Sequence, residues 1–312
     1  MQIAALGFLL YNIIAFGLQP ILGYYCDNNP TFPIGIIGCI VVTIGLAAIA
    51  FPWAALILCA LGNACFHVGG GIDSLVFSNG KMARSSICVS SGAIGVTLGT
   101  LAGQMQNNGL LVPYVLMILS IILLFVSTKK QKASGLCEFH LASHLPLAKI
   151  IFLAFISVMI RSYVGFIIPM AWKTGTNIFL PGICACFGKV AGGFLGDKFG
   201  ARTIGVLALT LSTPLLYFGE NTALLSMAGI VLFNMTMPIT LCTIASILKH
   251  NPGLSFGLTT LALLCGSIPT YFFSISLVQA RILLISFTLL SAFCTFISTK
   301  NKKGVASYEK NI

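Results

Sequence analysis

A few polar side chains lie inside long apolar runs, where they could bind a solute. Arg161 lies roughly 21 Å along the helix that its run would form from Leu147. A guanidinium at that depth is costly unless it faces a polar cavity or a partner. We therefore interpret Arg161 as a contact for an anionic or polar solute. The alternative is a structural pin bonded to carbonyl groups. Tyr163 could stack on, or hydrogen-bond to, the same solute.

Four other residues interrupt apolar runs in the same way. His67 has an imidazole that could carry a coupling proton, because its ordinary pKa lies near neutrality; it could equally be a hydrogen-bonded packing residue. Asn63 and Asn234 lie near the middle of their runs and could either join helices or contact a solute. Lys189 is expected to extend its flexible stem toward the nearest membrane surface.

A short charged turn separates two apolar runs at residues 188–203. Small residues at 188, 192, 193 and 196 would let a neighbouring helix approach closely. Asp197 ends the first run, and its carboxylate could accept hydrogen bonds from the N-terminus of a neighbouring helix, where the helix dipole favours a negative charge. Lys198 and Arg202 follow. Gly193, Asp197, Lys198 and Arg202 are therefore candidate functional residues of this turn.

The turn has an echo earlier in the chain. Gly23 precedes Gly193 by the same interval that separates Asp27 from Asp197, and the interval from Asn63 to Asn234 is longer by a single position. The earlier copy has no cation after its aspartate. Agreement between these intervals indicates an internal repeat, as in membrane proteins built from two parallel halves.

The composition identifies the solvent in which these runs must fold. Of 312 residues, 57% are hydrophobic and 7% are charged, whereas a soluble domain has about a quarter of its residues charged. Solid apolar runs of about 20 residues predict helices that cross a bilayer. A β-barrel would instead need alternating polarity. The sequence thus predicts an all-α, polytopic membrane protein with the lipid bilayer as its surroundings.

The apolar runs predict eleven transmembrane helices. Their expected bounds are residues 3–24, 32–51, 53–71, 85–104, 109–128, 147–170, 176–196, 202–219, 222–247, 253–276 and 281–299.

The cations of the loops predict an orientation. Thirteen lie in alternate loops and at the C-terminus, against two, Lys173 and Arg281, in the opposite loops. Positively charged loops stay in the cytoplasm, so we expect a multi-pass protein of the cytoplasmic membrane with its C-terminus inside. The same distribution explains the net charge of +11 without nucleic-acid binding. The predicted regions are an N-terminal half at 1–128, a cytoplasmic linker at 129–146, a C-terminal half at 147–299 and a basic tail at 300–312.

The linker contains Cys137, His140 and His144. The two histidines would share one face of a helix, but a solvated basic linker is the preferred interpretation over a metal site, which needs further ligands. No other group pairs a nucleophile with a base or clusters metal ligands, so neither an enzyme nor a metal or other cofactor is expected.

The turn at 188–203 resembles the loop signature Gly-x-x-x-Asp-(Arg/Lys)-x-Gly-x-(Arg/Lys) of the major facilitator superfamily. Residues 18–24, Phe66-His67 and residues 161–165 look most like the fosmidomycin-resistance group of drug-efflux carriers. The resemblance implies two six-helix halves, a turn that latches the cytoplasmic gate, and a cavity lined here by the third, sixth and ninth helices. Those helices contain the polar residues described above. It also implies that the first helix of the family is absent, and that the chain is a monomer.

Together, these observations predict a secondary transporter that moves a small organic solute, with drug efflux and proton coupling as more specific forms. Asp197, Lys198 and Arg202 would stabilise the closed gate. The alternative is a non-transporting remnant or a membrane-embedded binding protein, because loss of a cavity-lining helix would open the site to lipid.

Overall fold

The computed structural model describes residues 2–104, 109–128 and 136–300. Expectations about linker residues 129–135 and the tail at 301–312 lie outside these described residues. The helices of the described part are α1 (Gln2–Gly17), α2 (Gln19–Asn28), α3 (Ile34–Ala47), α4 (Pro52–Val76), α5 (Met82–Gln104), α6 (Leu111–Thr128), α7 (Leu147–Ile167), the 3₁₀ turn η1 (Gly175–Phe179), α8 (Leu180–Phe199), α9 (Ala201–Phe218), α10 (Ala223–Asn234), α11 (Thr236–Ile247), α12 (Pro252–Ser267), α13 (Pro269–Phe272) and α14 (Leu277–Ser298).

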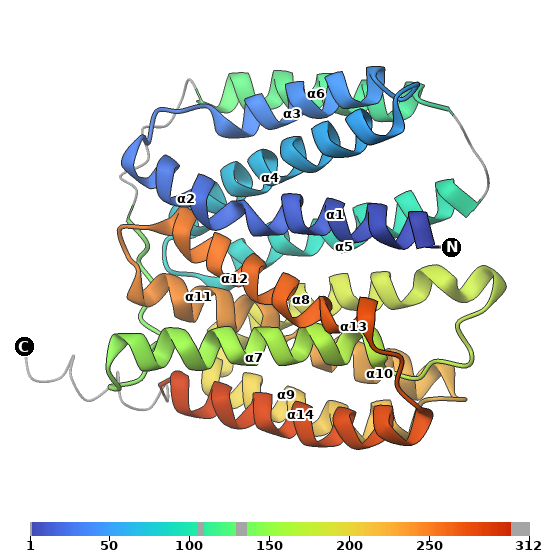
Figure 1. Ribbon diagram of the computed structural model, residues 1–312. Helices are drawn as coiled ribbons and strands as arrows, with labels where there is room; N and C mark the ends of the chain where they lie inside the picture. Colours follow the sequence, from blue (N-terminus) through green and yellow to red (C-terminus); the bar gives the residue numbers. More distant parts are fainter. Residues whose placement is uncertain (1, 105–108, 129–135, 301–312) are drawn as a thin grey trace, which may run out of the picture.

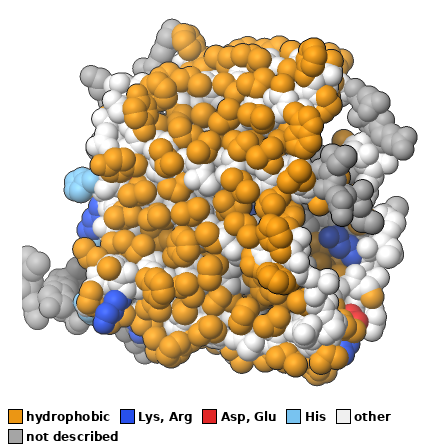
Figure 2. All heavy atoms as spheres, viewed as in Figure 1, with side chains coloured by type: hydrophobic (Ala, Val, Ile, Leu, Met, Phe, Trp, Pro, Cys, Tyr) orange, Lys and Arg blue, Asp and Glu red, His pale blue; other side chains and the backbone are white. Residues whose placement is uncertain are grey.

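The helices confirm the all-α membrane architecture. Within the described residues, nine helical segments are long and apolar enough to cross a membrane, and α3 and α6 are two shorter apolar helices. Large apolar side chains cover the face of the molecule shown in Figure 2, as expected for a surface that contacts lipid rather than water. Three predicted ends were short, because α2 continues past residue 24 to Asn28, α4 past residue 71 to Val76 and α8 past residue 196 to Phe199.

Three runs that were predicted as single helices are interrupted. The interruptions fall at Leu18, Met235 and Ile268. Each precedes a proline by one to three residues: Pro20, Pro238 and Pro269. A proline has no N–H to donate and its ring clashes with the carbonyl four residues earlier, so the helix breaks or kinks just before it. All three breaks lie inside segments long enough to cross a membrane.

The helices form two groups that meet along two helix pairs (Figure 1). In the view shown, α3, α4 and α6 lie at the top and α9 and α14 at the bottom. Between them, α2 packs against α12 and α5 packs against α8. Each of these pairs joins the first half of the chain to the second.

One end of the molecule, here called the linker end, contains the C-termini of α2, α4 and α8 and linker residues 136–146. Cys137 and Phe139 are fully buried there, in a cluster that also includes Leu75 of the first half and Ile239 of the second. The linker is thus exposed on one side, where both of its histidines face outward, while these two apolar side chains close the core.

The linker also pairs with the end of the last helix. Its backbone is extended, and Ala142 forms an antiparallel bridge with Thr299, while the Cys137 N–H donates to the Lys249 carbonyl at 2.8 Å. The sequence had suggested that His140 and His144 share one face of a helix, but the extended backbone means that they do not. No group of three possible metal ligands occurs within the part of the chain that the structure describes.

The α5 face that bears four regularly spaced glycines is uncovered. An added Cβ at Gly92, Gly95, Gly99 or Gly103 would meet nothing within 4 Å. The helix equivalent to α5 in the second half is α12, where the internal repeat pairs Gly95 with Gly266. A Cβ at Gly266 would lie 2.1 Å from the Met159 carbonyl oxygen of α7. The same face is thus packed in one half and open in the other.

Candidate functional site

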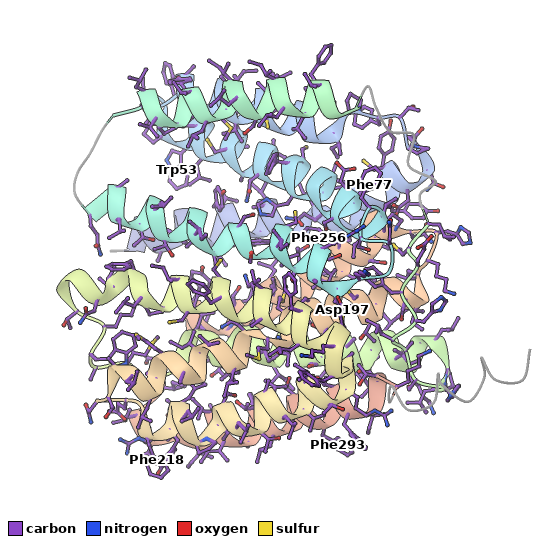
Figure 3. All side chains as sticks on the ribbon, turned by 180° about the vertical axis from the view of Figure 1, so that it is seen from behind. Trp53, Phe77, Asp197, Phe218, Phe256 and Phe293 are labelled. Atoms are coloured by element: carbon purple, nitrogen blue, oxygen red, sulfur yellow. The ribbon has the colours of Figure 1, made fainter. Side chains whose placement is uncertain are left out.

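Asp197 joins the two halves at the linker end. It lies near the C-terminus of α8, and its two carboxylate oxygens accept hydrogen bonds from the backbone N–H groups of Met82 at 3.0 Å and Ala83 at 2.9 Å. These N–H groups belong to the first turn of α5, which has no intrahelical acceptors for them. Figure 3 shows Asp197 where α8 meets the start of α5. The carboxylate therefore caps a helix of the other half.

Asp27 forms the equivalent contact in the reverse direction. Its oxygens accept hydrogen bonds from the N–H groups of Gly253 at 2.7 Å and Leu254 at 2.9 Å, in the first turn of α12. The internal repeat pairs these two donors with the two donors to Asp197. We call these two contacts the Asp27 clamp and the Asp197 clamp. Each half thus contributes one carboxylate and one helix N-terminus, whose dipole favours a negative charge.

Glycines explain how the clamps reach across. Gly193 stands one turn before Asp197, and a Cβ there would lie 2.2 Å from the Ser86 hydroxyl of α5. Gly23 has the same relation to Asp27, and a Cβ there would lie 2.2 Å from the Gly253 carbonyl oxygen. Any larger residue would push the helices apart. The spacing Gly-x-x-x-Asp therefore sets both the close contact and the reach of the carboxylate.

The two cations after Asp197 form contacts with aromatic rings, and Arg202 also binds a carbonyl group. Arg202 lies in α9 and donates from Nε to the Thr299 carbonyl at 2.7 Å, with a second bond from Nη2 to the same oxygen. Its guanidinium also lies 4.8 Å from the centre of the Phe296 ring. The Lys198 ammonium lies 5.1 Å from the Phe199 ring. Arg202 therefore ties α9 to the end of α14 within the second half.

Arg161 is buried within the second half, with 6% of its surface exposed. Its Nη1 donates to the Thr236 hydroxyl at 2.6 Å and its Nη2 donates to the Thr240 hydroxyl at 2.8 Å. Its Nε has no hydrogen-bond partner among the residues that the structure describes. Sequence reasoning missed both threonines, although their spacing of four residues inside an apolar run was a signal that they share one helix face.

The break between α10 and α11 positions these threonines. A Cβ at Gly188 of α8 would lie 2.2 Å from the Val231 carbonyl oxygen, and one at Gly192 would lie 2.0 Å from the Met235 carbonyl oxygen. The glycine-bearing face of α8 therefore packs directly on the break. Asn234, the last residue of α10, donates from its side chain to the Ile230 carbonyl at 2.9 Å.

Lys189 lies at the middle of α8, about 14 Å along the helix axis from either end. It is half-buried, and its charge acts on both Arg161 and His67. Lys189 therefore lies at the middle of its helix, within electrostatic range of two candidate site residues. The His67 Nδ1 lies 3.1 Å from the Asn63 carbonyl oxygen. A carbonyl only accepts, so this contact assigns the ring proton to Nδ1.

Tyr163 is not brought together with Arg161. Side chains two positions apart on a helix point in nearly opposite directions, because each residue turns the helix by about 100°. The Tyr163 ring accordingly packs against Phe287 of α14, with ring centres 5.9 Å apart, while Arg161 points to α11.

A cavity of about 150 Å³ lies behind the Asp197 clamp, next to the linker. Its lining includes Met82, Asp197, His140 and Lys300. Partial burial lowers the pKa of His140, and the positive charges of Lys249 and Lys300 lower it further. Burial also raises the pKa of the Cys137 thiol to about 12. The linker thus packs beside the clamp with a neutral thiol and an imidazole that resists protonation.

No protein-family model matches the sequence, and no curated protein sequence matches it. Solved structures do match the fold. The E. coli fucose:proton symporter FucP aligns with 95% of this chain and 88% of its own, at 13% identity and a TM-score of 0.66. The human organic anion transporter MFSD10 (TETRAN) aligns with 94% and 83%, at 15% identity and a TM-score of 0.64. A structure of FucP in the outward conformation, described as a major facilitator superfamily transporter, aligns with 95% of this chain and 88% of its own chain. The identity is 13% and the TM-score is 0.61. The chain therefore has the fold of the major facilitator transporters.

Proposed function

We propose that this chain is a secondary transporter of the major facilitator type, which moves a small organic solute across the membrane by alternating access. One observation carries the proposal: Asp27 and Asp197 form equivalent clamps that cross between the halves in opposite directions. Carboxylates that cap helices of the other half form contacts that can be broken and re-formed as the halves move, without disturbing either core.

The clamps act as the latch of one gate. Each carboxylate replaces water as the acceptor for two helix N–H groups, and opening returns both partners to water. Because such exchanges of hydrogen bonds nearly balance in free energy, the closed and open states can lie within the few kcal/mol that a transported solute must shift. Arg202 then holds the end of α14 and the linker in place while the halves move.

The solute site lies around the break between α10 and α11. Arg161 donates to Thr236 beside this break, and the charge of Lys189 acts on Arg161. A site at the middle of the membrane between two repeats is what alternating access requires. The positively charged loops support a cytoplasmic-membrane protein with its linker end and C-terminus inside. We treat the functional unit as a monomer with one such site.

Two finer forms of the proposal are open to test. Drug efflux is supported by the resemblance of residues 18–24, 66–67 and 161–165 to the fosmidomycin-resistance carriers. Proton coupling is supported by His67, which is half-buried near Lys189 and has Nε2 as its second proton site. Cells expressing the chain should survive a higher concentration of a toxic solute, and His67→Gln should make that protection independent of the proton gradient.

We also propose that one further helix packs on the glycine face of α5, as α7 packs on α12. The support is the contrast between Gly95, which meets nothing within 4 Å, and the equivalent Gly266, which touches α7. By the internal repeat, this helix belongs to the first half and precedes α1. It would correspond to the family helix that the sequence resemblance implies is absent.

The function is tested by solute counterflow. The purified chain is placed in liposomes loaded with one unlabelled solute from a panel of small organic acids, sugars and amines, and uptake of the labelled form is measured. A transporter gives transient, saturable accumulation that Arg161→Gln reduces at least tenfold. Saturable binding without accumulation for every solute would instead favour the alternative of a membrane-embedded binding protein.

A further inference from the structure

We infer that the solute of this site is an organic anion, held by Arg161 and Lys189; the inference rests on the proposed transport function. Both cations lie well inside their helices. Arg161 lies about 9 Å from the nearer end of α7, at Ile167, and is buried, and Lys189 lies about 14 Å from the start of α8. A cation at that depth is costly without a counter-charge.

The described part of the chain supplies no counter-charge to them. The chain has six acidic residues, and the five that the structure describes belong elsewhere. Asp27 and Asp197 cap helices at the linker end, and Glu220 forms an ion pair of 2.6 Å with Arg281. Asp73 lies near the end of α4 and Glu138 lies in the linker. The sixth, Glu309, belongs to the tail outside the described residues. Within the described part of the chain, no carboxylate is among the charges that act on Arg161 or Lys189.

The bonds that Arg161 does make leave its charge uncompensated. The Thr236 hydroxyl donates its proton to the Phe233 carbonyl at 3.1 Å, and the Thr240 hydroxyl donates to the Thr236 carbonyl at 3.0 Å. Both hydroxyls therefore offer lone pairs to the guanidinium, which orients it. They are neutral, however, and the buried Nε still has no acceptor. An unpaired donor of this kind is expensive to keep.

A second cation, Lys189, adds to the uncompensated positive charge. The charges of Lys189 and Arg161 repel each other, and Lys189 also acts on His67 from the first half. Two like charges inside the membrane raise the energy of the empty site, and one anion between them lowers it. A carboxylate, phosphonate or sulfonate group fits, because a guanidinium binds planar or tetrahedral oxyanions through paired bonds while an ammonium binds them as a point charge.

The thermal stability of the ligand-free protein distinguishes the two possible roles of Arg161. If Arg161 were a structural pin, Arg161→Met would lower the thermal midpoint, Tm. If Arg161 is kept for an anion, Arg161→Met should raise the Tm of the ligand-free protein, because both threonine hydroxyls remain bonded to their own helix and the uncompensated charge is gone. The control is Arg281→Met, which breaks the ion pair with Glu220 and should lower the Tm.

The ligand class is tested on the same purified full chain in detergent. The probes are benzoate, benzenesulfonate and phenylphosphonate, with benzamide and benzylamine as neutral and cationic analogues of the same shape. At millimolar concentration, at least one anion should raise the Tm while the amide and the amine do not. Arg161→Met and Lys189→Gln, the latter introducing the residue found at the equivalent position 19, should each raise the concentration needed at least tenfold. Arg281→Met should not change it.

Four results would overturn the inference: a lower Tm of ligand-free Arg161→Met, no Tm rise with any of the three anions, an equal rise with benzamide, or an unchanged anion response in Arg161→Met. Counterflow separates this outcome from the proposed function. Accumulation of only a neutral or cationic solute would support the transport function and contradict the anion as its solute. Anion binding without accumulation would support the anion site and contradict the transport function.

Discussion

At the scale of single residues, glycines decide where helices can touch. Gly193 and Gly23 each allow a helix of the other half to come close enough for the aspartate one turn later to reach its N-terminus. The residue types at these four positions follow from that geometry. A carboxylate is required because it can accept two hydrogen bonds from adjacent N–H groups at once.

Matched glycine substitutions test the open face of α5. Gly266→Leu should destabilise the chain by about 1–3 kcal/mol, because its side chain would meet the Met159 carbonyl of α7. Gly95→Leu should change stability by less than about 0.5 kcal/mol, because its side chain would meet open space. Thermal unfolding of the two variants in detergent measures the contrast.

The same pair tests whether a further helix covers that face. When the chain is produced with an additional helix before α1, Gly95→Leu should become as damaging as Gly266→Leu. If Gly95→Leu is still harmless there, the proposed helix does not pack on α5.

Sequence reasoning identified some of these residues and not others. The aspartates could be predicted as acceptors for helix N-termini, because a carboxylate ending a glycine-rich run has few other uses. Lys189 could not be placed, since its long stem can reach either the membrane surface or the interior. Tyr163 was placed next to Arg161 by its position in the sequence, but the turn of the helix separates the two side chains.

At the scale of helices, the sequence predicted where each span lies but not how three of them break. The prolines were visible, yet Pro214 stands inside the unbroken helix α9. A proline therefore does not by itself fix a break. At Met235 the neighbouring α8 decides the outcome, because its small residues at 188 and 192 pack on the α10–α11 junction. Such packing between segments distant in sequence cannot be seen in either run alone.

The break should be essential to the site. Gly192→Val would place a branched side chain against the Met235 carbonyl, 2.0 Å from an added Cβ, and should displace α11 and its two threonines from Arg161. We expect a lower Tm and a loss of the anion response together. Ala191→Val, one residue away on another helix face, is the control and should leave the anion response intact; loss of the response in both variants would contradict the role of the break.

The linker should respond to acid. His140 has a lowered pKa when the linker is docked, so the undocked linker binds more protons. Docking is therefore favoured above the ordinary histidine pKa of about 6.5 and weakens as the pH falls below it. Hydrogen–deuterium exchange of residues 136–144, corrected for the intrinsic effect of pH, should rise in acid. His140→Gln should remove that rise, and an unchanged rise in this variant would contradict the role of His140.

At the scale of the whole molecule, the internal repeat organises both the fold and the clamps. Residues that the repeat pairs have equivalent roles at the linker end, whereas the centre is asymmetric. Lys189 corresponds to Gln19, so the repeat does not place a second cation at the equivalent position of the first half. The gate therefore follows the repeat, and the charge at the centre departs from it.

The proposed gate requires that the Asp27 and Asp197 clamps hold the linker end closed. Hydrogen–deuterium exchange at Met82–Ala83 and Gly253–Leu254 measures this directly, in the native chain and in Asp197→Asn, Asp27→Asn and the double variant, with Glu220→Gln at the opposite end as the control. Each single variant should speed exchange at its own helix start, and the double variant should also expose the buried cluster around Leu75 and Ile239. A double variant that exchanges like the native chain at all these positions would contradict the account.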